Sequence, residues 1–168
     1  MGGILIAMAT AWGASRNMHS KFAALAESLH PSFERLMQCE PHTGRVRLPL
    51  DVPRCAVYLF SEGADHLYVG RTDRLRERHR QHWSGRDNDA PFAFKLARHE
   101  TKNVGKGGLT RKQLMVDAEF SAAFLRAKNR VAGMEFRWVE ETDPNRQCLL
   151  EIYATVVLDA RYNDFINH

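Results

Sequence analysis

The sequence predicts an α/β fold of the α+β kind, with a small, mainly antiparallel three-stranded sheet flanked by helices. Two short apolar runs, residues 55–60 and 67–70, flank a turn-forming stretch and predict a hairpin. A third segment, residues 134–141, alternates polar and apolar side chains and predicts the remaining strand, with Phe136 and Trp138 on one side. Apolar residues at helical spacing fill most of the chain between these segments.

Residues 1–50 predict a helical N-terminal extension and a connector. Within residues 20–37 apolar side chains recur at helical spacing, and Pro31 predicts a break between two short helices. We interpret this segment as a structural cap rather than a DNA-contacting arm, because it holds few basic residues. Residues 41–53 read as a Gly- and Pro-containing connector with one short strand at 46–50. The apolar start, residues 2–12, is too short to span a bilayer and lacks a basic leader, so we expect neither signal peptide nor membrane anchor.

A basic helix follows the hairpin directly. Gly70 ends the second strand, and Thr72 is predicted to cap a helix that begins near Asp73. The inward face of that helix carries residues at i, i+3, i+4 and i+7: Leu75, Arg78, His79 and His82. Because an unpaired buried arginine is costly, Arg78 must have a partner or a function.

The second half of the chain predicts three further helices. Pro91 begins a helix over residues 91–100, and a glycine- and lysine-rich loop follows at 101–108, which we interpret as mobile and as a candidate DNA contact. Thr110 caps a helix that extends to about residue 131. Asp143 and Pro144 open the last helix, where a broad apolar arc is predicted to lie opposite Glu151.

Composition limits the class of protein. With 168 residues, 44% of them hydrophobic and 26% charged, the chain is long enough for one domain with a real core. Its net charge of +4 and isoelectric point near 9.1 modestly favour a polyanionic partner. Six arginines lie within one short span: Arg71, Arg74, Arg76, Arg78, Arg80 and Arg86. If they bind no polyanion, those other than Arg78 simply form a solvated helix face.

The cysteines indicate a reducing, cytoplasmic location. Cys39, Cys55 and Cys148 are odd in number, widely spaced and without a C-x-x-C pair. This spacing argues against a disulfide framework and against a zinc site.

The hairpin and the basic helix together carry a recognisable motif. The AVY and YVG tripeptides, followed by an arginine and a histidine, resemble the signature of the GIY-YIG nuclease family, Y-[IV]-G-x-[TSA]-x-x-L-x-x-R-x-x-x-H. The match has no gap and comprises Tyr68, Val69, Gly70, Arg71, Thr72, Leu75, Arg78 and His82. Ala56 departs from the pattern, because the first tripeptide normally begins with glycine. The resemblance covers residues 54–163 and implies a nuclease domain over 51–168 with a helical insert around 99–131.

The resemblance also implies a catalytic set. The family places its single metal-binding glutamate on a helix after the third strand and an asparagine shortly afterwards, positions that Glu151 and Asn163 occupy here. From spacing alone, Glu151 is more simply an exposed residue of a buried helix. By the resemblance it would hold Mg2+ or Mn2+, which polarises the scissile phosphate. Arg78 would neutralise the charge that grows on the phosphoryl oxygens.

The remaining roles follow from the same resemblance. Tyr58, or else Tyr68, would relay the proton of the attacking water, provided that nearby cations lower its pKa. His82 would orient the phosphate or another side chain, and its plain alternative is a hydrogen-bonded, partly buried histidine. The expected DNA contacts are Arg71, Arg74, Arg76, Arg80, Arg86 and Asn163. We expect Tyr58, Tyr68, Arg78 and Glu151 to converge on one concave site.

These expectations amount to a metal-dependent endonuclease that hydrolyses DNA phosphodiester bonds. The first alternative is a catalytically inactive nucleic-acid-binding module of the same fold. The second is an unrelated small α/β interaction protein that matches the motif by chance. Monomer and homodimer both remain open, and no membrane partner is expected.

Overall fold

The computed structural model describes residues 18–104 and 108–163, and the expectations for residues 1–17 and for the middle of the 101–108 loop fall outside these ranges. In chain order the elements are α1 (Ser20–Glu27), α2 (His30–Gln38), β1 (Ala56–Glu62), β2 (Asp65–Thr72), α3 (Leu75–Ser84), α4 (Pro91–Glu100), α5 (Arg111–Val116), α6 (Ala118–Gly133), β3 (Glu135–Glu140) and α7 (Pro144–Val157). The three strands form one antiparallel sheet in the order β2-β1-β3, which confirms the predicted α+β class.

The hairpin is tighter than predicted. The strands extend to Glu62 and Asp65, so the turn between them contains only Gly63 and Ala64, and Gly63 has the positive φ of +59° that such turns require. The pairing register shifts between Phe60 and Ser61. With this shift, Tyr58 lies opposite Gly70, and Tyr68 lies opposite Phe60.

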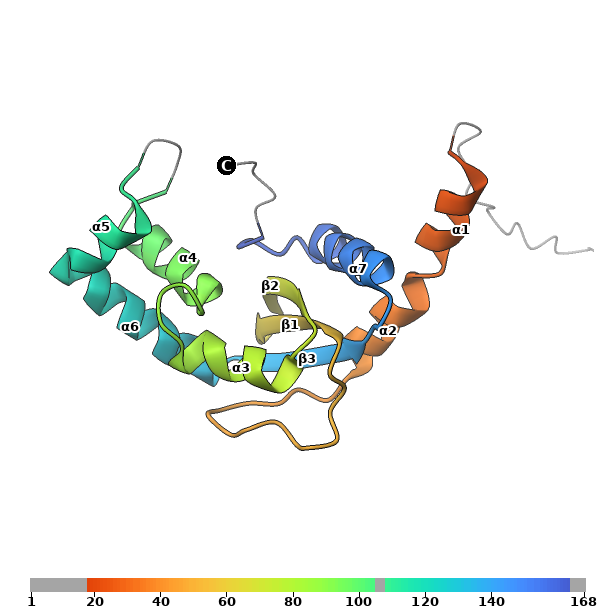
Figure 1. Cartoon of the computed structure of the whole chain (residues 1–168), viewed down its shortest axis with the longest axis horizontal. Coiled ribbons are helices and arrows are strands. Elements are labelled where there is room, and N and C mark those ends of the chain that lie inside the picture. Colours follow the sequence, from red (N-terminus) through yellow and green to blue (C-terminus); the bar gives the residue numbers. More distant parts are fainter. Residues whose placement is uncertain (1–17, 105–107, 164–168) are drawn as a thin grey trace, which may run out of the picture.

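Both faces of the sheet are buried, because side chains of β1 alternate between two cores. Ala56, Tyr58 and Phe60 pack into a core with α3, α4 and α6. Val57 and Leu59 pack into a second core with α2 and α7. Figure 1 shows the sheet in the middle of the molecule, with α4–α6 on one side and α2 and α7 on the other.

The N-terminal extension covers part of the sheet, as the cap interpretation expects. Its two helices break at Ser28 and Leu29, and Pro31 lies in the first turn of α2. α2 buries Leu36 against the second core and contacts β3, whereas no residue of α1 is buried.

The strand predicted at 46–50 is wrong. The connector has a single bridge to the sheet, from His42 to Phe136 on β3. Leu48 is buried, but Val46 and Leu50 are 62% and 84% exposed, because the segment leaves the β3 edge after His42 and pairs with no further strand.

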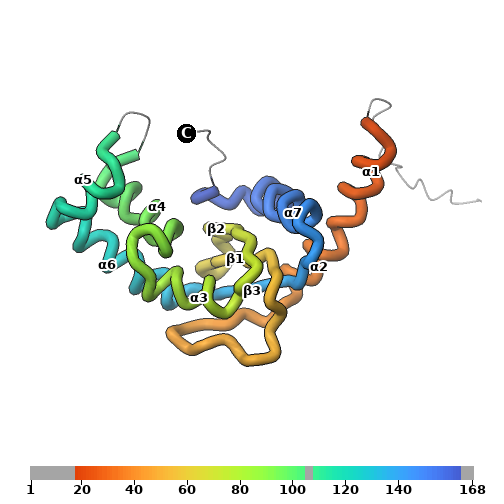
Figure 2. The backbone as a smooth tube through the Cα atoms, in the orientation of Figure 1, coloured from red at the N-terminus to blue at the C-terminus, as the bar shows by residue number. Residues whose placement is uncertain are grey.

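The insert is two helices, not one. Asp117 ends α5 and accepts a hydrogen bond from the Phe120 backbone N–H, so it caps α6. Thr110 and Gln113 form the capping box that begins α5, as predicted for Thr110. Phe120 and Phe124 lie in the same core as Tyr58, so the insert shares the core of the sheet. Figure 2 shows the path of the insert, in which α6 runs beside α4.

The last helix, α7, begins as predicted, but a different face of it packs against the sheet. Asp143 accepts hydrogen bonds from the Asn145 and Arg146 N–H groups, and Pro144 opens the helix. The apolar face that was predicted to be buried is buried only in part, because Ile152, Val156 and Val157 are exposed. The residues of α7 that are buried are Gln147, Leu150, Ala154 and Thr155. Since α7 packs on β2 and β1 through this other face, Glu151 lies beside the sheet and not opposite the buried side.

The end of the described chain covers the free edge of β2. The Tyr162 N–H donates to the Leu67 carbonyl, and the Asn163 side chain pairs with both backbone groups of Val69. Covering an edge in this way prevents pairing with another chain. In the parts of the chain that the structure describes, no helix has both the length and the apolar character needed to cross a bilayer.

Candidate functional site

An open pocket of about 560 Å³ lies at the edge of β2. It joins the two faces of the sheet, because α3 forms one wall, α7 the other, and the end of β2 the floor between them. The lining residues are Arg71, Thr72, Asp73, Arg74, Glu77, Arg78, Gln81, Gln147 and Glu151. The pocket therefore brings together Arg78 and Glu151, which are far apart in the sequence. Tyr58 and Tyr68 do not line it and lie behind Arg78.

Arg78 is held in place by two hydrogen bonds. Its Nε donates to the Tyr58 hydroxyl at 3.2 Å, and its Nη1 donates to the Asp89 carbonyl at 3.0 Å. Burial alone lowers the pKa of Arg78, but its interactions with Tyr58 and Tyr68 more than offset that, and the pKa is raised. The guanidinium is thus charged, half-buried and fixed at the pocket wall. The partners that a buried arginine requires are the Tyr58 hydroxyl and the Asp89 carbonyl.

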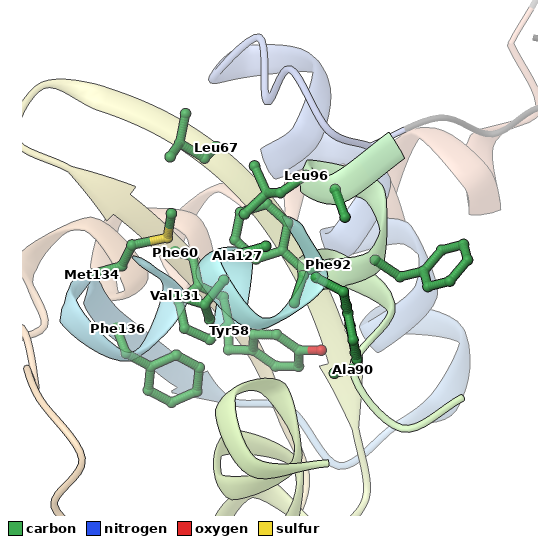
Figure 3. Close-up of a cluster of buried hydrophobic side chains, with 14 of the residues drawn as sticks. Tyr58, Phe60, Leu67, Ala90, Phe92, Leu96, Ala127, Val131, Met134 and Phe136 are labelled. Carbon is green, nitrogen blue, oxygen red and sulfur yellow. The ribbon is translucent and has the colours of Figure 1, made fainter. Parts of the chain in front are cut away.

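Tyr58 is almost completely buried. Its ring packs with Phe60 and Phe136, and its hydroxyl lies 2.9 Å from His82 Nε2. Figure 3 shows the Tyr58 ring inside the aromatic cluster, with its oxygen directed away from Phe136. The ring lies over Gly70, where an added Cβ would come within 2.4 Å of the Tyr58 ring carbon and oxygen. Only glycine fits opposite Tyr58, which explains the third position of the YVG tripeptide.

In the free protein the neighbouring arginines do not lower the tyrosine pKa values. Burial raises the pKa of Tyr58, and the Arg78 charge offsets it only in part. Burial also raises the pKa of Tyr68, with the neighbouring Tyr58 acting in the same direction. The Tyr68 ring lies 6.4 Å from that of Tyr58 and stacks on Phe92. Both phenols therefore keep their protons at neutral pH in the free protein.

His82 is buried and does not reach the pocket. Its exposed fraction is 0%, and Nε2 contacts the Tyr58 hydroxyl while Nδ1 has no partner among the described residues. Burial, followed by the Arg78 charge, lowers the pKa of His82 well below its ordinary value, so the ring is neutral. A direct contact from His82 to phosphate is excluded by this burial. Orienting another side chain, Tyr58, is the alternative that the geometry favours.

Glu151 faces Arg71 across the pocket. Arg71 Nε donates to Glu151 Oε2 at 2.9 Å, and the Glu151 side chain is 19% exposed. Burial raises the pKa of Glu151, while the Arg71 charge and hydrogen bond counteract the rise. The other two pocket carboxylates, Asp73 and Glu77, both pair with Arg74. They are 70% and 41% exposed, so Glu151 is the least exposed of the three and the acid that a second cation would stabilise most.

The expected DNA-contacting arginines differ in their exposure and in their protein partners. Arg80 and Arg86 are exposed, and Arg86 approaches only Asp89, at 4.0 Å. Arg74 is paired within the pocket, while Arg76 Nε donates to the Leu48 carbonyl and ties the connector to α3. DNA contact by these residues stays a prediction.

The Asn163 side chain forms two hydrogen bonds with the free edge of β2. Its Oδ1 accepts from the Val69 N–H at 2.8 Å, and its Nδ2 donates to the Val69 carbonyl at 2.7 Å. Both polar ends of the side chain are thus engaged by backbone. The predicted contact of Asn163 with nucleic acid would require this pairing to open.

Sequence reasoning missed two glutamines of the pocket. Gln147 is 8% exposed and precedes Glu151 by one helical turn, while Gln81 extends from α3 and donates to Glu77. The i, i+4 spacing of Gln147 and Glu151 places both on one helix face and was the available signal. The carbonyl of Asp89 gave no sequence signal, because any residue type supplies one.

The residues present fit a hydrated Mg2+ or Mn2+ ion. Across residues 18–104 and 108–163, no three His, Cys, Asp or Glu side chains are grouped to hold a metal. Mg2+ does not need such a group, since it commonly keeps several waters and binds through one or two carboxylates. Glu151 supplies a partly buried anionic ligand, one oxygen of which is paired with Arg71 in the free protein.

Comparison of this chain with protein-family models, curated proteins and solved structures finds no match. The resemblance to GIY-YIG nucleases thus stays a prediction from the motif. The roles of the pocket residues are argued below from geometry and chemistry.

Proposed function

We propose that this chain is a metal-dependent endonuclease of the GIY-YIG type that hydrolyses DNA phosphodiester bonds in the β2-edge pocket. The observation that carries the proposal is that Arg78 and Glu151 line one pocket from opposite walls, on α3 and α7. A fixed cation on one side of an open pocket and a carboxylate on the other suit a phosphodiester and a bound divalent ion.

Arg78 stabilises the phosphoryl oxygens. Tyr58 and Asp89 hold its guanidinium before substrate arrives, so little reorganisation is needed when negative charge develops. A planar fork also binds two phosphate oxygens at once, which an ammonium group does not.

Glu151 holds the divalent ion, and Arg71 is its counter-ion in the free protein. When bound, Mg2+ or Mn2+ polarises the phosphate and lowers the pKa of a coordinated water. Arg71 is 45% exposed and its long side chain is free to exchange Glu151 for a DNA phosphate. This exchange gives Arg71 its proposed place among the nucleic-acid-binding residues.

The tyrosines act mainly through Arg78. With its pKa raised, the Tyr58 phenol is not a base at neutral pH, and the neutral His82 ring next to it fixes its orientation. Tyr68 is the more exposed of the two and remains the better candidate to pass on a proton. Because burial disfavours the phenolate, the Tyr68 hydroxyl would have to accept one proton as it gives up another.

A nicking assay tests the proposal. The purified chain is incubated with supercoiled, branched and single-stranded DNA in the presence of Mg2+, Mn2+ or EDTA. We expect cleavage of at least one DNA substrate with either metal and none with EDTA. Absence of cleavage on every substrate with both metals would overturn the nuclease function. The same buffer and substrates serve the variants described in the Discussion.

A binding module without hydrolysis is the second candidate, because Arg71 neutralises Glu151 in the pocket. If that ion pair never opens, no divalent cation reaches Glu151, and the arginines still bind DNA. Tight DNA binding that is identical with Mg2+ and EDTA, without cleavage, would favour this candidate. A cytoplasmic location belongs to the same proposal and rests on the cysteines alone.

A further inference from the structure

Gln147 is buried at the meeting point of the three strands. Its Nε2 donates to the carbonyls of Thr72 at 2.9 Å, Glu141 at 3.3 Å and Ala56 at 3.4 Å. These carbonyls end β2, follow β3 and begin β1, respectively. Because all three neighbours are acceptors, the amide nitrogen must face them. The orientation of the Gln147 amide is therefore set by the sheet.

The amide oxygen is left on the other side. Within the described residues, Oε1 of Gln147 has no hydrogen-bond partner, yet it is not among the buried atoms that lack one. It therefore touches solvent, and Gln147 lines the β2-edge pocket. An acceptor is thus aimed into the pocket by a side chain that is more than nine-tenths buried.

Glu151 lies one helical turn after Gln147, so the two side chains are neighbours on α7. Amide and carboxylate oxygens are both ligands of hard divalent cations and acceptors for their waters. We propose that Gln147 Oε1 is the second protein oxygen of the cation site, next to Glu151. This inference rests on the proposed function, and it assigns Gln147 a role that the sequence motif does not contain.

A purely structural role for Gln147 predicts something different. If the side chain only ties the strand ends together, any substitution that removes the Nε2 donor disturbs the pocket and weakens cation binding. Gln147→Met and Gln147→Glu both remove that donor. Only the glutamate variant restores an oxygen, now charged, to the side of the pocket. The two variants therefore move cation affinity in opposite directions only if the oxygen faces the cation.

The test measures Mn2+ affinity of the full chain without DNA, by electron paramagnetic resonance of free Mn2+. We expect Gln147→Met to weaken binding about 10- to 100-fold, the usual effect of losing a group that supports a metal site. We expect Gln147→Glu to bind Mn2+ more tightly than the parent. Gln81→Glu is the matched control, because it adds the same charge to the opposite wall of the same pocket. Circular dichroism of each variant verifies the fold.

Several outcomes would overturn the inference. One is weaker binding by both Gln147 variants, and another is a gain in Gln147→Glu no larger than in Gln81→Glu. If the parent binds Mn2+ and Gln147→Met matches it, only the inference fails. If the parent binds no Mn2+ in the absence of DNA, the inference fails, and the nicking assay decides the proposed function separately.

A measurement on the parent alone covers the case in which the variants do not fold. In a 15N-labelled sample, Mn2+ must broaden the side-chain NH2 signals of Gln147 more strongly than those of Gln81. Equal broadening of the two amides would contradict the placement of Gln147 at the cation.

Discussion

The ring of Tyr58 lies directly over the Cα of Gly70, its partner across the β1–β2 ladder, and leaves no room for a side chain there. This contact positions the Tyr58 hydroxyl, which in turn accepts the hydrogen bond from Arg78. A residue without a side chain on one strand thus determines where the arginine of the pocket points.

Gly70→Ala is expected to destabilise the protein and to misplace Arg78. Its Cβ would lie 2.4 Å from the Tyr58 ring, and such overpacking typically costs about 1–3 kcal/mol. Urea unfolding measures the loss in free energy of unfolding, and the nicking assay measures the loss in activity. Gly133→Ala is the matched control, because an added Cβ there meets nothing within 4 Å. Equal stability of the two variants would show that the Tyr58 ring moves aside freely.

Arg78→Lys tests the fixed guanidinium. A lysine keeps the charge but cannot bond the Tyr58 hydroxyl and the Asp89 carbonyl together, as Arg78 does. We expect kcat for cleavage to fall about 100- to 1000-fold, the usual effect of losing a fixed donor at a developing negative charge. Arg35→Lys, on the exposed side of α2 and outside the pocket, is expected to cleave like the parent. Parent-like activity in Arg78→Lys would mean that only the charge matters.

The salt dependence of DNA binding tests the exposed arginines. If Arg80 and Arg86 contact phosphates, each change to glutamine lowers the log–log slope of affinity against salt by about one unit. Arg76 is tied to the Leu48 carbonyl, so its substitution should change the slope less. Fluorescence anisotropy with duplex DNA gives the slopes, and Arg35→Gln on α2 is the charge control. A slope unchanged in every variant would make these arginines a solvated face.

His79 is expected to make stability fall in acid. Burial, followed by the neighbouring His42, lowers its pKa to about 4 from an ordinary 6.5. Between these values the unfolded chain binds the proton and the folded chain does not, so stability decreases as pH falls from about 6.5 to 4. The contribution is at most about 3 kcal/mol. Buried His82, with its lowered pKa, acts in the same direction.

His79→Phe keeps a ring against Phe136 and removes this titration. Urea unfolding at several pH values should therefore show a flatter decline than in the parent. The exposed His99→Phe serves as control and should retain the parent slope. An equal decline in all three proteins would assign the acid sensitivity to other groups.

Much of the fold was predictable because its signals are local. The hairpin, the start of α4 at Pro91 and the Asp143–Pro144 start of α7 depend on turn and cap residues within a few positions. The break at Asp117 was missed, since its neighbours continue the helical pattern and only the cap to Phe120 ends it. The buried face of α7 was missed for another reason. Apolar residues occur all round that helix, and contact with the strand ends decides which of them lie inside.

For the site, the sequence predicted some of the residues that line the pocket but not how they are buried and paired. The motif contains Arg78, the family resemblance implied Glu151, and the pocket contains both. The spacing placed His82 on the inward helix face, but the complete burial of Tyr58 and His82 depends on Phe60 and Phe136, which pack there from two other segments. For the same reason the sequence did not show that burial raises the tyrosine pKa values. The Arg71–Glu151 pair joins β2 to α7 and had no local sequence signal.

The central claim is tested most directly by comparing cleavage by Glu151→Gln and Glu77→Gln at equal Mg2+. Both remove one carboxylate from the same pocket, but Glu77 lies on the α3 wall and is 41% exposed, whereas Glu151 lies on the α7 wall and is 19% exposed. Glutamine has a similar volume and helix propensity, so both variants should stay folded. We predict that Glu151→Gln loses cleavage by orders of magnitude while its DNA affinity stays or rises, and that Glu77→Gln cleaves. Cleavage by Glu151→Gln at the rate of the parent would contradict the claim and make this glutamate structural.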